Sequence, residues 1–132
     1  MQPPFNYKKL DQRRARLKMP KTALATRARV SLPTINRILS GQEPNPTIGN
    51  LTAIAAALGL TIRIGASIGI EETESANEYR IKEARAKAKR LVTMVQGTMA
   101  LEAQAIDGSD AERLVDQTTY ELLNSKRRLW GE

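Results

Sequence analysis

The stretch "KTALATRARVSLPTINRILSG", residues 21–41, contains two short helix signals separated by a tight turn. In the first, Leu24 and Ala28 are four residues apart, a spacing that puts both on one helix face. The second begins with Ser31, a good N-cap, and ends at Gly41, which favours the left-handed backbone of a helix C-cap. Such a pair occurs in many helical cores, so the side chains facing away from the core decide whether it also binds something.

Composition narrows the possible classes of protein. The 132 residues contain no cysteine and no histidine, which excludes disulfide frameworks, thiol nucleophiles, zinc clusters and the most common general base. Aromatic residues make up only 4% of the chain, so a core must be built from aliphatic side chains, which favours helices. No apolar run approaches the roughly 18 residues of a membrane span, and the N-terminus lacks the apolar core of a signal peptide. We therefore expect a cytoplasmic protein with no cofactor, no metal and no membrane contact.

The charge of the chain is unevenly distributed. The net charge is +7, but residues 1–65 carry eleven basic and two acidic side chains, whereas residues 66–132 carry ten and twelve. The first part is therefore strongly basic and the second slightly acidic. A basic segment of this kind suits a polyanion such as nucleic acid, although a solubilising surface would have the same composition.

The hydrophobic pattern predicts a mainly α fold. Residues 1–65 are expected to form a helical domain, with helix signals at 3–19, 21–28, 31–40 and 47–58, followed by a short strand over 60–65. Since a single strand is not stable alone, it needs a partner, such as the same strand of a second copy in a homodimer.

The rest of the chain is predicted to be a linker followed by a helical arm. The linker is "ASIGIEETES", residues 66–75. The arm, residues 76–132, is expected to contain a long helix, a break at "IDGSDAE", a shorter helix and the basic tail "SKRRLWGE". Its acidic side chains are not placed with a nucleophile or a metal partner, so we expect no enzyme activity.

The outward face of residues 20–42 has the chemistry of a major-groove reader. A helix that enters the groove presents its N-terminal residues and one face to base edges, while the preceding helix contacts phosphates. Arg37 can pair with guanine through two hydrogen bonds, and the Leu32–Pro33 pair suits thymine methyl groups. Lys21 and Gln42 are expected to contact phosphates. The predicted DNA-binding residues are Lys21, Thr22, Arg29, Ser31, Leu32, Pro33, Thr34, Asn36, Arg37 and Gln42.

Two segments, "LATRARVSLPTINRILSG" and "PNPTIGNLTAIAAALGL", resemble the helix-turn-helix of the phage-repressor-like (XRE/Cro) family. The resemblance covers about residues 8–62. It implies a five-helix DNA-binding module that usually acts as a dimer on palindromic operators. The chain departs from the family at Arg29, where glycine is usual in the turn, and at Lys21, where glutamine is frequent.

The arm and tail are predicted to bind a protein partner. We expect that contact from Leu91, Val95 and Met99 on the long helix, and from an exposed Leu–Trp pair with two cations before it: Arg127, Arg128, Leu129 and Trp130. The architecture resembles that of antitoxins in bacterial toxin–antitoxin pairs. The segments "LVTMVQGTMALEAQ" and "RRLW" look like the C-terminal parts of antitoxins paired with nucleotidyltransferase-type (AbiEii-like) toxins. That resemblance implies a protein that neutralises a toxin and represses their shared operon.

Three other functions are open to this sequence. The first is a stand-alone XRE-type transcriptional regulator whose C-terminal helices only dimerise. The second is an RNA-binding module, which is disfavoured because residues 1–65 contain only two aromatic side chains to act as a stacking platform. The third is an enzyme, for which the sequence offers no active site.

Overall fold

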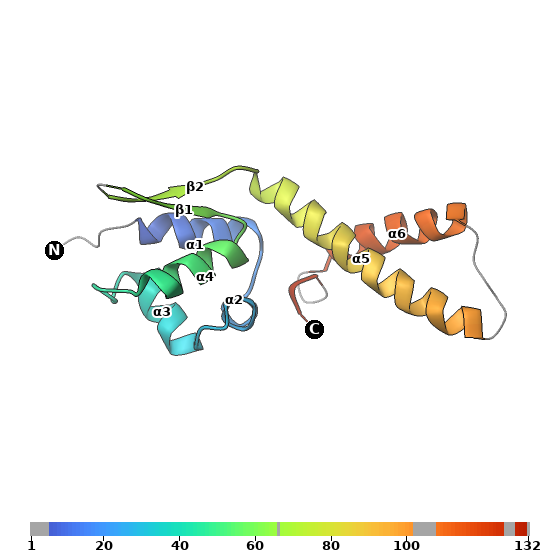
Figure 1. The fold of residues 1–132 in the computed structure, drawn as a ribbon, viewed down its shortest axis with the longest axis horizontal. Coiled ribbons are helices and arrows are strands. Elements are labelled where there is room, and N and C mark those ends of the chain that lie inside the picture. The colour runs from blue at the N-terminus through green and yellow to red at the C-terminus, as the bar shows by residue number, and fades with distance from the viewer. Residues whose placement is uncertain (1–5, 66, 102–107, 126–128, 132) are drawn as a thin grey trace. The chain divides into compact units, whose positions relative to one another are not determined.

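The computed structural model describes residues 6–65, 67–101, 108–125 and 129–131. The chain divides into two compact units, one ending at Tyr79 and the other beginning at Arg80 (Figure 1). The fold is mainly helical, with a helix-turn-helix, a short sheet, a long helix and a shorter helix in that order. The predicted fold class is thus confirmed, and each unit is described separately below.

The described part of the first unit contains four complete helices. Three begin within one residue of the predicted positions: α2 (Lys21–Ala28), α3 (Leu32–Ser40) and α4 (Ile48–Ala57). The first helix, α1 (Tyr7–Arg16), is shorter than the predicted 3–19. Three of the four helices have a side-chain N-cap. Asn6, Ser31 and Thr47 each accept a hydrogen bond from the backbone N–H three residues ahead. These caps accept hydrogen bonds from N–H groups that have no partner within the helix, so the local sequence determines where the helices begin.

All four helices end in the same way, with one residue in the left-handed conformation. At Gly41 (φ 80°) and Gly59 (φ 71°) the sequence supplies glycine, but Lys18 (φ 56°) and Arg29 (φ 57°) adopt the same conformation with a side chain. At each end, the next residue donates its N–H to a carbonyl five positions back, as Val30 does to the oxygen of Ala25 at 3.1 Å. These Schellman motifs close every helix, and the two without glycine carry a strain of about 1 kcal/mol each.

The core of the first unit is built from aliphatic side chains of all four helices. The stripes predicted from the spacing are buried, including Leu24 in α2, Ile35 and Ile38 in α3, and Leu51 and Ile54 in α4. The side chains that are essentially fully buried in this unit are Leu10, Leu17, Met19, Leu24, Ile35, Ile38, Leu51, Ile54 and Leu58. This core fixes the angle between the helices, and therefore the direction in which the outer face of α3 points.

A β-hairpin follows the helices, which corrects two predictions. Strand β1 (Thr61–Ile64) pairs antiparallel with β2 (Ile68–Glu71), in a register that places Ile62 opposite Ile70. Residues 66–75 are therefore not simply a linker, and the strand over 60–65 has a partner within its own chain. The strand β2 was not predicted because its apolar alternation is only two isoleucines long. A homodimer remains a prediction, but it is no longer supported by a strand that lacks a partner.

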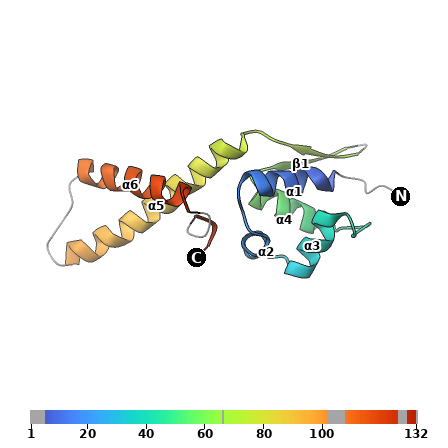
Figure 2. The same ribbon diagram turned by 180° about the vertical axis from the view of Figure 1, so that it is seen from behind.

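The hairpin lies along α1 in both views (Figures 1 and 2). The ammonium group of Lys9 donates a hydrogen bond of 2.7 Å to the backbone oxygen of Ile70, which joins the helix to β2. Ile70 is buried, whereas Ile64 near the hairpin turn is exposed. The base of the hairpin is thus part of the first unit's core region, and its tip is not.

The most unexpected feature of the first unit is the buried side chain of Arg13, which is 2% exposed. Its Nε donates to the backbone oxygen of Leu58 at 2.8 Å, at the C-terminal end of α4. Its Nη1 donates to Oε1 of Glu72 at 2.7 Å and to the backbone oxygen of Glu74 at 3.0 Å. The guanidinium also lies over the ring of Tyr79, 5.5 Å from the centroid. One side chain therefore joins α1, the end of α4 and the segment leading into the next helix.

The second unit is a pair of helices. The long helix α5 (Ala76–Leu101) enters it at Arg80 and lies beside α6 (Gly108–Leu123) (Figures 1 and 2). Arg85 forms an ion pair of 2.8 Å with Asp116, and Arg80 donates to the backbone oxygen of Leu123 at 2.9 Å. The buried apolar side chains on the two helices are Ala84, Ala88, Val92, Val115 and Leu122.

The C-terminal segment corrects a further prediction. Leu129 and Trp130 are 1% and 3% exposed, so the expectation of an exposed Leu–Trp pair is wrong. The ammonium group of Lys87 on α5 donates a hydrogen bond of 2.7 Å to the backbone oxygen of Gly131, which folds the segment back onto the long helix. The sequence indicated two large apolar side chains near a terminus but could not indicate that α5 holds them. Arg127 and Arg128 lie outside the described residues.

Candidate nucleic-acid interface

The helices α2 and α3 form the helix-turn-helix. In both ribbon views α2 is seen nearly end-on while α3 lies across the picture, so the two helices cross at a steep angle (Figures 1 and 2). The turn between them consists of Arg29, Val30 and Ser31. Arg29 takes the left-handed conformation that glycine would adopt, and its side chain is exposed. The departure from the family pattern thus preserves the turn and adds a cation at the surface.

The outer face of α3 is accessible, as the sequence predicted. Among the ten predicted DNA-binding residues only Thr34 is partly covered, and the others are exposed. Leu32 is one of the few large apolar side chains left exposed among the described residues, and it lies at the first position of α3, beside Pro33. An apolar contact at the start of a recognition helix is what a thymine methyl group requires. The residues of this face are Ser31, Leu32, Pro33, Thr34, Asn36 and Arg37.

A row of polar contacts runs along this face. The hydroxyl of Ser31 donates to Oγ1 of Thr34 at 2.8 Å, and Nη2 of Arg37 donates to the same oxygen at 3.2 Å. Nε of the same guanidinium lies 3.6 Å from Oε2 of Glu43. The hydroxyl of Thr34 accepts twice and still has its own proton to donate. Arg37 therefore contacts two side chains before any ligand arrives.

Glu43 was not among the residues predicted from the sequence to act at this site. It is one of only two acidic side chains in residues 1–65, and it stands directly after the turn that ends α3. The other, Asp11, accepts a hydrogen bond of 2.9 Å from Nε of Arg14 within α1. An isolated acid near the end of a basic recognition helix was the available signal for Glu43.

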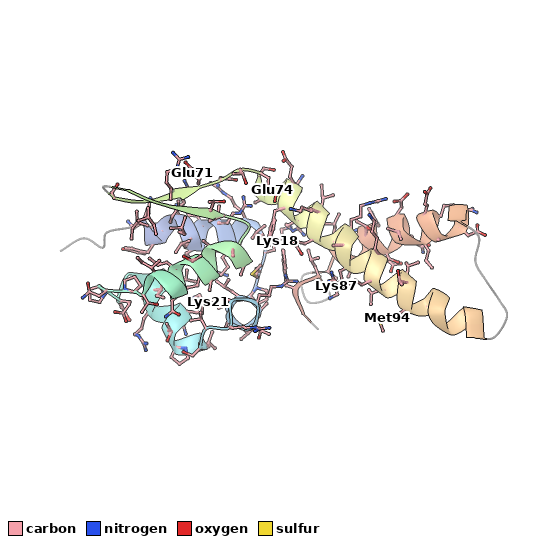
Figure 3. The ribbon with its side chains drawn as sticks, in the orientation of Figure 1. Lys18, Lys21, Glu71, Glu74, Lys87 and Met94 are labelled. Atoms are coloured by element: carbon pink, nitrogen blue, oxygen red, sulfur yellow. The ribbon has the colours of Figure 1, made fainter. Side chains whose placement is uncertain are left out.

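The start of α2 suits a phosphate. Its N-cap is Pro20, which provides no side-chain hydrogen bond to the N–H groups of the first turn. Lys21 and Thr22 are exposed at this end, and Figure 3 labels Lys21 there. Backbone N–H groups and the positive end of the helix dipole favour an anion, and the lysine adds a full charge. Gln42 is exposed just beyond α3, next to the left-handed Gly41.

The predicted partner-binding residues of α5 have different environments. Leu91 is half-buried, Val95 is exposed, and the side chain of Met99 lies outside those described. Met94, which the sequence analysis did not place in this set, is 69% exposed and is labelled in Figure 3. Among the described residues of α5, the exposed large apolar side chains are Ile81, Met94 and Val95, and the last two are adjacent.

An open pocket of about 340 Å³ lies between α5 and α6 in the described part of the second unit. Its walls are chemically mixed: Arg85, Lys89, Val92, Thr93, Ala111, Glu112 and Val115. Across the described ranges, no group of three or more acidic side chains is placed to hold a metal ion. Within the same ranges, the helices are too short or too polar to cross a membrane.

Comparison with known proteins agrees with this geometry. Residues 10–64 match the family model described as Helix-turn-helix (HTH_3), from Leu10 in α1 to Ile64 at the end of β1. No curated protein and no solved structure matches the chain. Residues 10–64 are therefore a helix-turn-helix domain of the XRE type, a class of domain that binds DNA in transcriptional regulators. The second unit lies outside the matched segment.

Proposed function

We propose that this protein is an antitoxin that represses its own operon. The first unit binds operator DNA through α3, and the second unit binds and neutralises a protein toxin. The observation that carries the DNA-binding half is the accessible face of α3, on which Arg37 contacts both Thr34 and Glu43. This face combines a guanidinium, two hydroxyls, an amide and an apolar contact on a rigid helix, which is the set of groups that base edges require.

Direct base contact is assigned to Arg37, Asn36 and Thr34. Arg37 pairs with a guanine, and Leu32 and Pro33 contact thymine methyl groups. Lys21, Thr22, Arg29 and Gln42 contact phosphates, which position the domain without reading sequence. Because single recognition helices read only a few base pairs, the protein binds as a homodimer on two half-sites about one helical turn apart.

Two substitutions test this assignment. Arg37→Ala should weaken operator binding by about 1–3 kcal/mol and relax the preference for one base pair. Lys21→Ala should weaken binding to all sequences alike and reduce the slope of log K against log salt by about one. Binding is measured by fluorescence anisotropy on operator and scrambled DNA at several salt concentrations. Equal effects of both substitutions on both DNAs would contradict the placement of α3 in the groove.

The toxin-binding half of the proposal is supported by exposed apolar side chains on α5. Met94 and Val95 are adjacent, 69% and 47% exposed, and they follow the buried Val92. Methionine adapts to irregular partner surfaces, and an exposed apolar pair on a helix suits a helix-in-groove contact. The resemblance of residues 91–104 to AbiEii-like antitoxins favours a nucleotidyltransferase-type toxin as the partner.

The test is genetic and uses the full chain. The product of the neighbouring gene in the operon should arrest growth when expressed alone, and co-expression of this protein should restore growth. The double variant Met94→Glu/Val95→Glu should lose that protection, whereas Tyr120→Glu, on the exposed side of α6, should keep it. Operator binding serves as a folding control for both variants.

The stand-alone regulator is the other outcome of this test. A neighbouring product that does not affect growth, with operator binding intact and only a homodimer in native mass spectrometry, would favour that function. In that case the helices of the second unit serve only for dimerisation.

A further inference from the structure

We infer that Glu43 determines DNA sequence specificity by holding Arg37 in the orientation that reads a base. The inference rests on the proposed DNA-binding function and adds a residue to it. Glu43 itself is a positioning residue, because it acts through Arg37. The observation behind it is the ion pair between Nε of Arg37 and Oε2 of Glu43, at 3.6 Å on the outer side of α3.

The position of Glu43 is fixed by the backbone. After the left-handed Gly41, the chain turns back so that the N–H groups of Gln42 and Glu43 both donate to the backbone oxygen of Arg37, at 2.9 and 3.2 Å. Oε1 of Glu43 accepts a hydrogen bond of 3.3 Å from the N–H of Asn45. One carboxylate oxygen is thus held by the loop while the other faces the guanidinium. The side chain of Glu43 is 28% exposed, so the loop limits its freedom.

The arginine is correspondingly constrained. Glu43 occupies the Nε side, and Thr34 accepts from Nη2, while half of the side-chain surface of Arg37 is exposed. A free arginine loses rotamer entropy when it is fixed in one orientation. Here part of that loss has occurred before DNA binds, which increases the free energy gained when the guanidinium pairs with a guanine.

The negative charge of Glu43 also lowers the affinity of the protein for every DNA sequence. Its carboxylate lies on a face that must approach phosphates, so it weakens binding by electrostatic repulsion whatever the bases are. The orienting effect appears only where a guanine is present to be read. Together these two effects increase the ratio of operator affinity to non-specific affinity, which is the quantity that defines specificity.

The experiment compares the full-length protein with its Glu43→Gln variant on two DNAs. One is a sequence that the unmodified protein selects from a random pool, and the other is a scrambled duplex of equal length. Glu43→Gln removes the charge and keeps the shape. We expect scrambled DNA to bind about two- to threefold more tightly, and the affinity ratio to fall about fivefold.

A matched control separates orientation from charge alone. Glu71 on β2, labelled in Figure 3, forms an ion pair of 3.0 Å with Arg63 and lies in the same unit. Glu71→Gln changes the net charge by the same amount, so it should leave the ratio unchanged. In an Arg37→Ala background, Glu43→Gln should also leave the ratio unchanged, because there is no guanidinium to hold.

Three results would overturn the inference: an unchanged ratio in Glu43→Gln, an equal fall in Glu71→Gln, or an equal fall in the Arg37→Ala background. Thermal melts followed by circular dichroism establish that each variant is folded. If the unmodified protein selects no sequence from the pool, the proposed function fails together with the inference. A clear selected sequence with an unchanged ratio overturns the inference alone.

Discussion

Two ion pairs of nearly the same length distinguish the two units of this protein. In the first unit Arg13 contacts Glu72 at 2.7 Å with its side chain 2% exposed. In the second, Arg85 contacts Asp116 at 2.8 Å with its side chain 47% exposed. The distances are nearly the same. However, the guanidinium of Arg13 is shielded from solvent and depends on protein acceptors, whereas that of Arg85 remains accessible to water. Distance alone therefore says little about what an ion pair contributes to the fold.

The two units also differ in the local interactions that define their helices. Every helix of the first unit has a defined end, and three have side-chain N-caps, so its geometry is fixed at many points. In the second unit α5 contributes small buried side chains such as Ala84 and Ala88, and the buried Nε of Arg80 has no hydrogen-bond partner among the described residues. A rigid first unit suits base reading, where side chains must be held closely in place. The four predictions below test this contrast.

The largest effect is expected at Arg13. Arg13→Met keeps the apolar part of the side chain but leaves the backbone oxygen of Leu58 and the carboxylate of Glu72 without this donor. We expect the free energy of unfolding to fall by about 4 kcal/mol, as for a buried pair that loses one member. Arg85→Met is the matched control and should cost less than about 1 kcal/mol. Urea titrations measure both, and equal losses would contradict the contrast between the two pairs.

Trp130 tests whether the C-terminal segment belongs to the fold. Because its side chain is 3% exposed, Trp130→Ala should lower the free energy of unfolding by about 3 kcal/mol. Tyr120→Ala, at a side chain that is 70% exposed, should change it by less than about 0.5 kcal/mol. In the unmodified protein, Trp130 is the only tryptophan, so acrylamide should quench its fluorescence weakly. Strong quenching would show that Trp130 is exposed to solvent and would contradict the burial of this segment.

A smaller effect is expected at Gly59, where a close approach and a positive φ coincide. A Cβ atom added there would lie 2.6 Å from Cδ2 of Tyr79, whose ring packs over the end of α4. Gly59→Ala should therefore lower the free energy of unfolding by about 2 kcal/mol, from backbone strain and displacement of the ring. Gly65→Ala is the control, since no atom lies within 4 Å of the added Cβ. Equal melting temperatures for the two variants would contradict the packing of Tyr79.

The smallest effect concerns the two left-handed residues that are not glycine. Lys18→Gly and Arg29→Gly should each raise the free energy of unfolding by about 0.5–1 kcal/mol, because they relieve strain at φ near 57°. Only Arg29→Gly should also weaken DNA binding, by removing one phosphate contact and about one unit of salt slope. A loss of stability in both variants would show that these side chains stabilise the helix ends by other contacts.

Local sequence predicted most of the candidate site. The caps at Ser31 and Gly41 and the spacing of Leu24, Ile35 and Ile38 were sufficient to place α2 and α3 and to identify their outer face. These signals act over one or two helical turns, so no tertiary information was needed. The role of Glu43 was not predicted, because it depends on how the loop after α3 turns back toward Arg37.

Away from the site, the failures have the same cause. The strand β2 contains only two isoleucines, and its pairing with β1 becomes favourable because α1 and Lys9 support it. Leu129 and Trp130 were expected at the surface because the sequence cannot indicate that Lys87, more than forty residues earlier, binds the backbone beside them.

The sequence by itself determined where the helices of the first unit begin and end, which of their faces are buried, and that the remaining face is basic. These properties follow from caps, helical spacing and charge, all of which act locally along the chain. The tertiary structure decided which polar groups meet across the fold: Arg13 with the end of α4 and Glu72, Lys9 with β2, and Lys87 with the C-terminal backbone. Those contacts join residues more than forty positions apart, and only packing of the apolar core brings them within hydrogen-bonding distance.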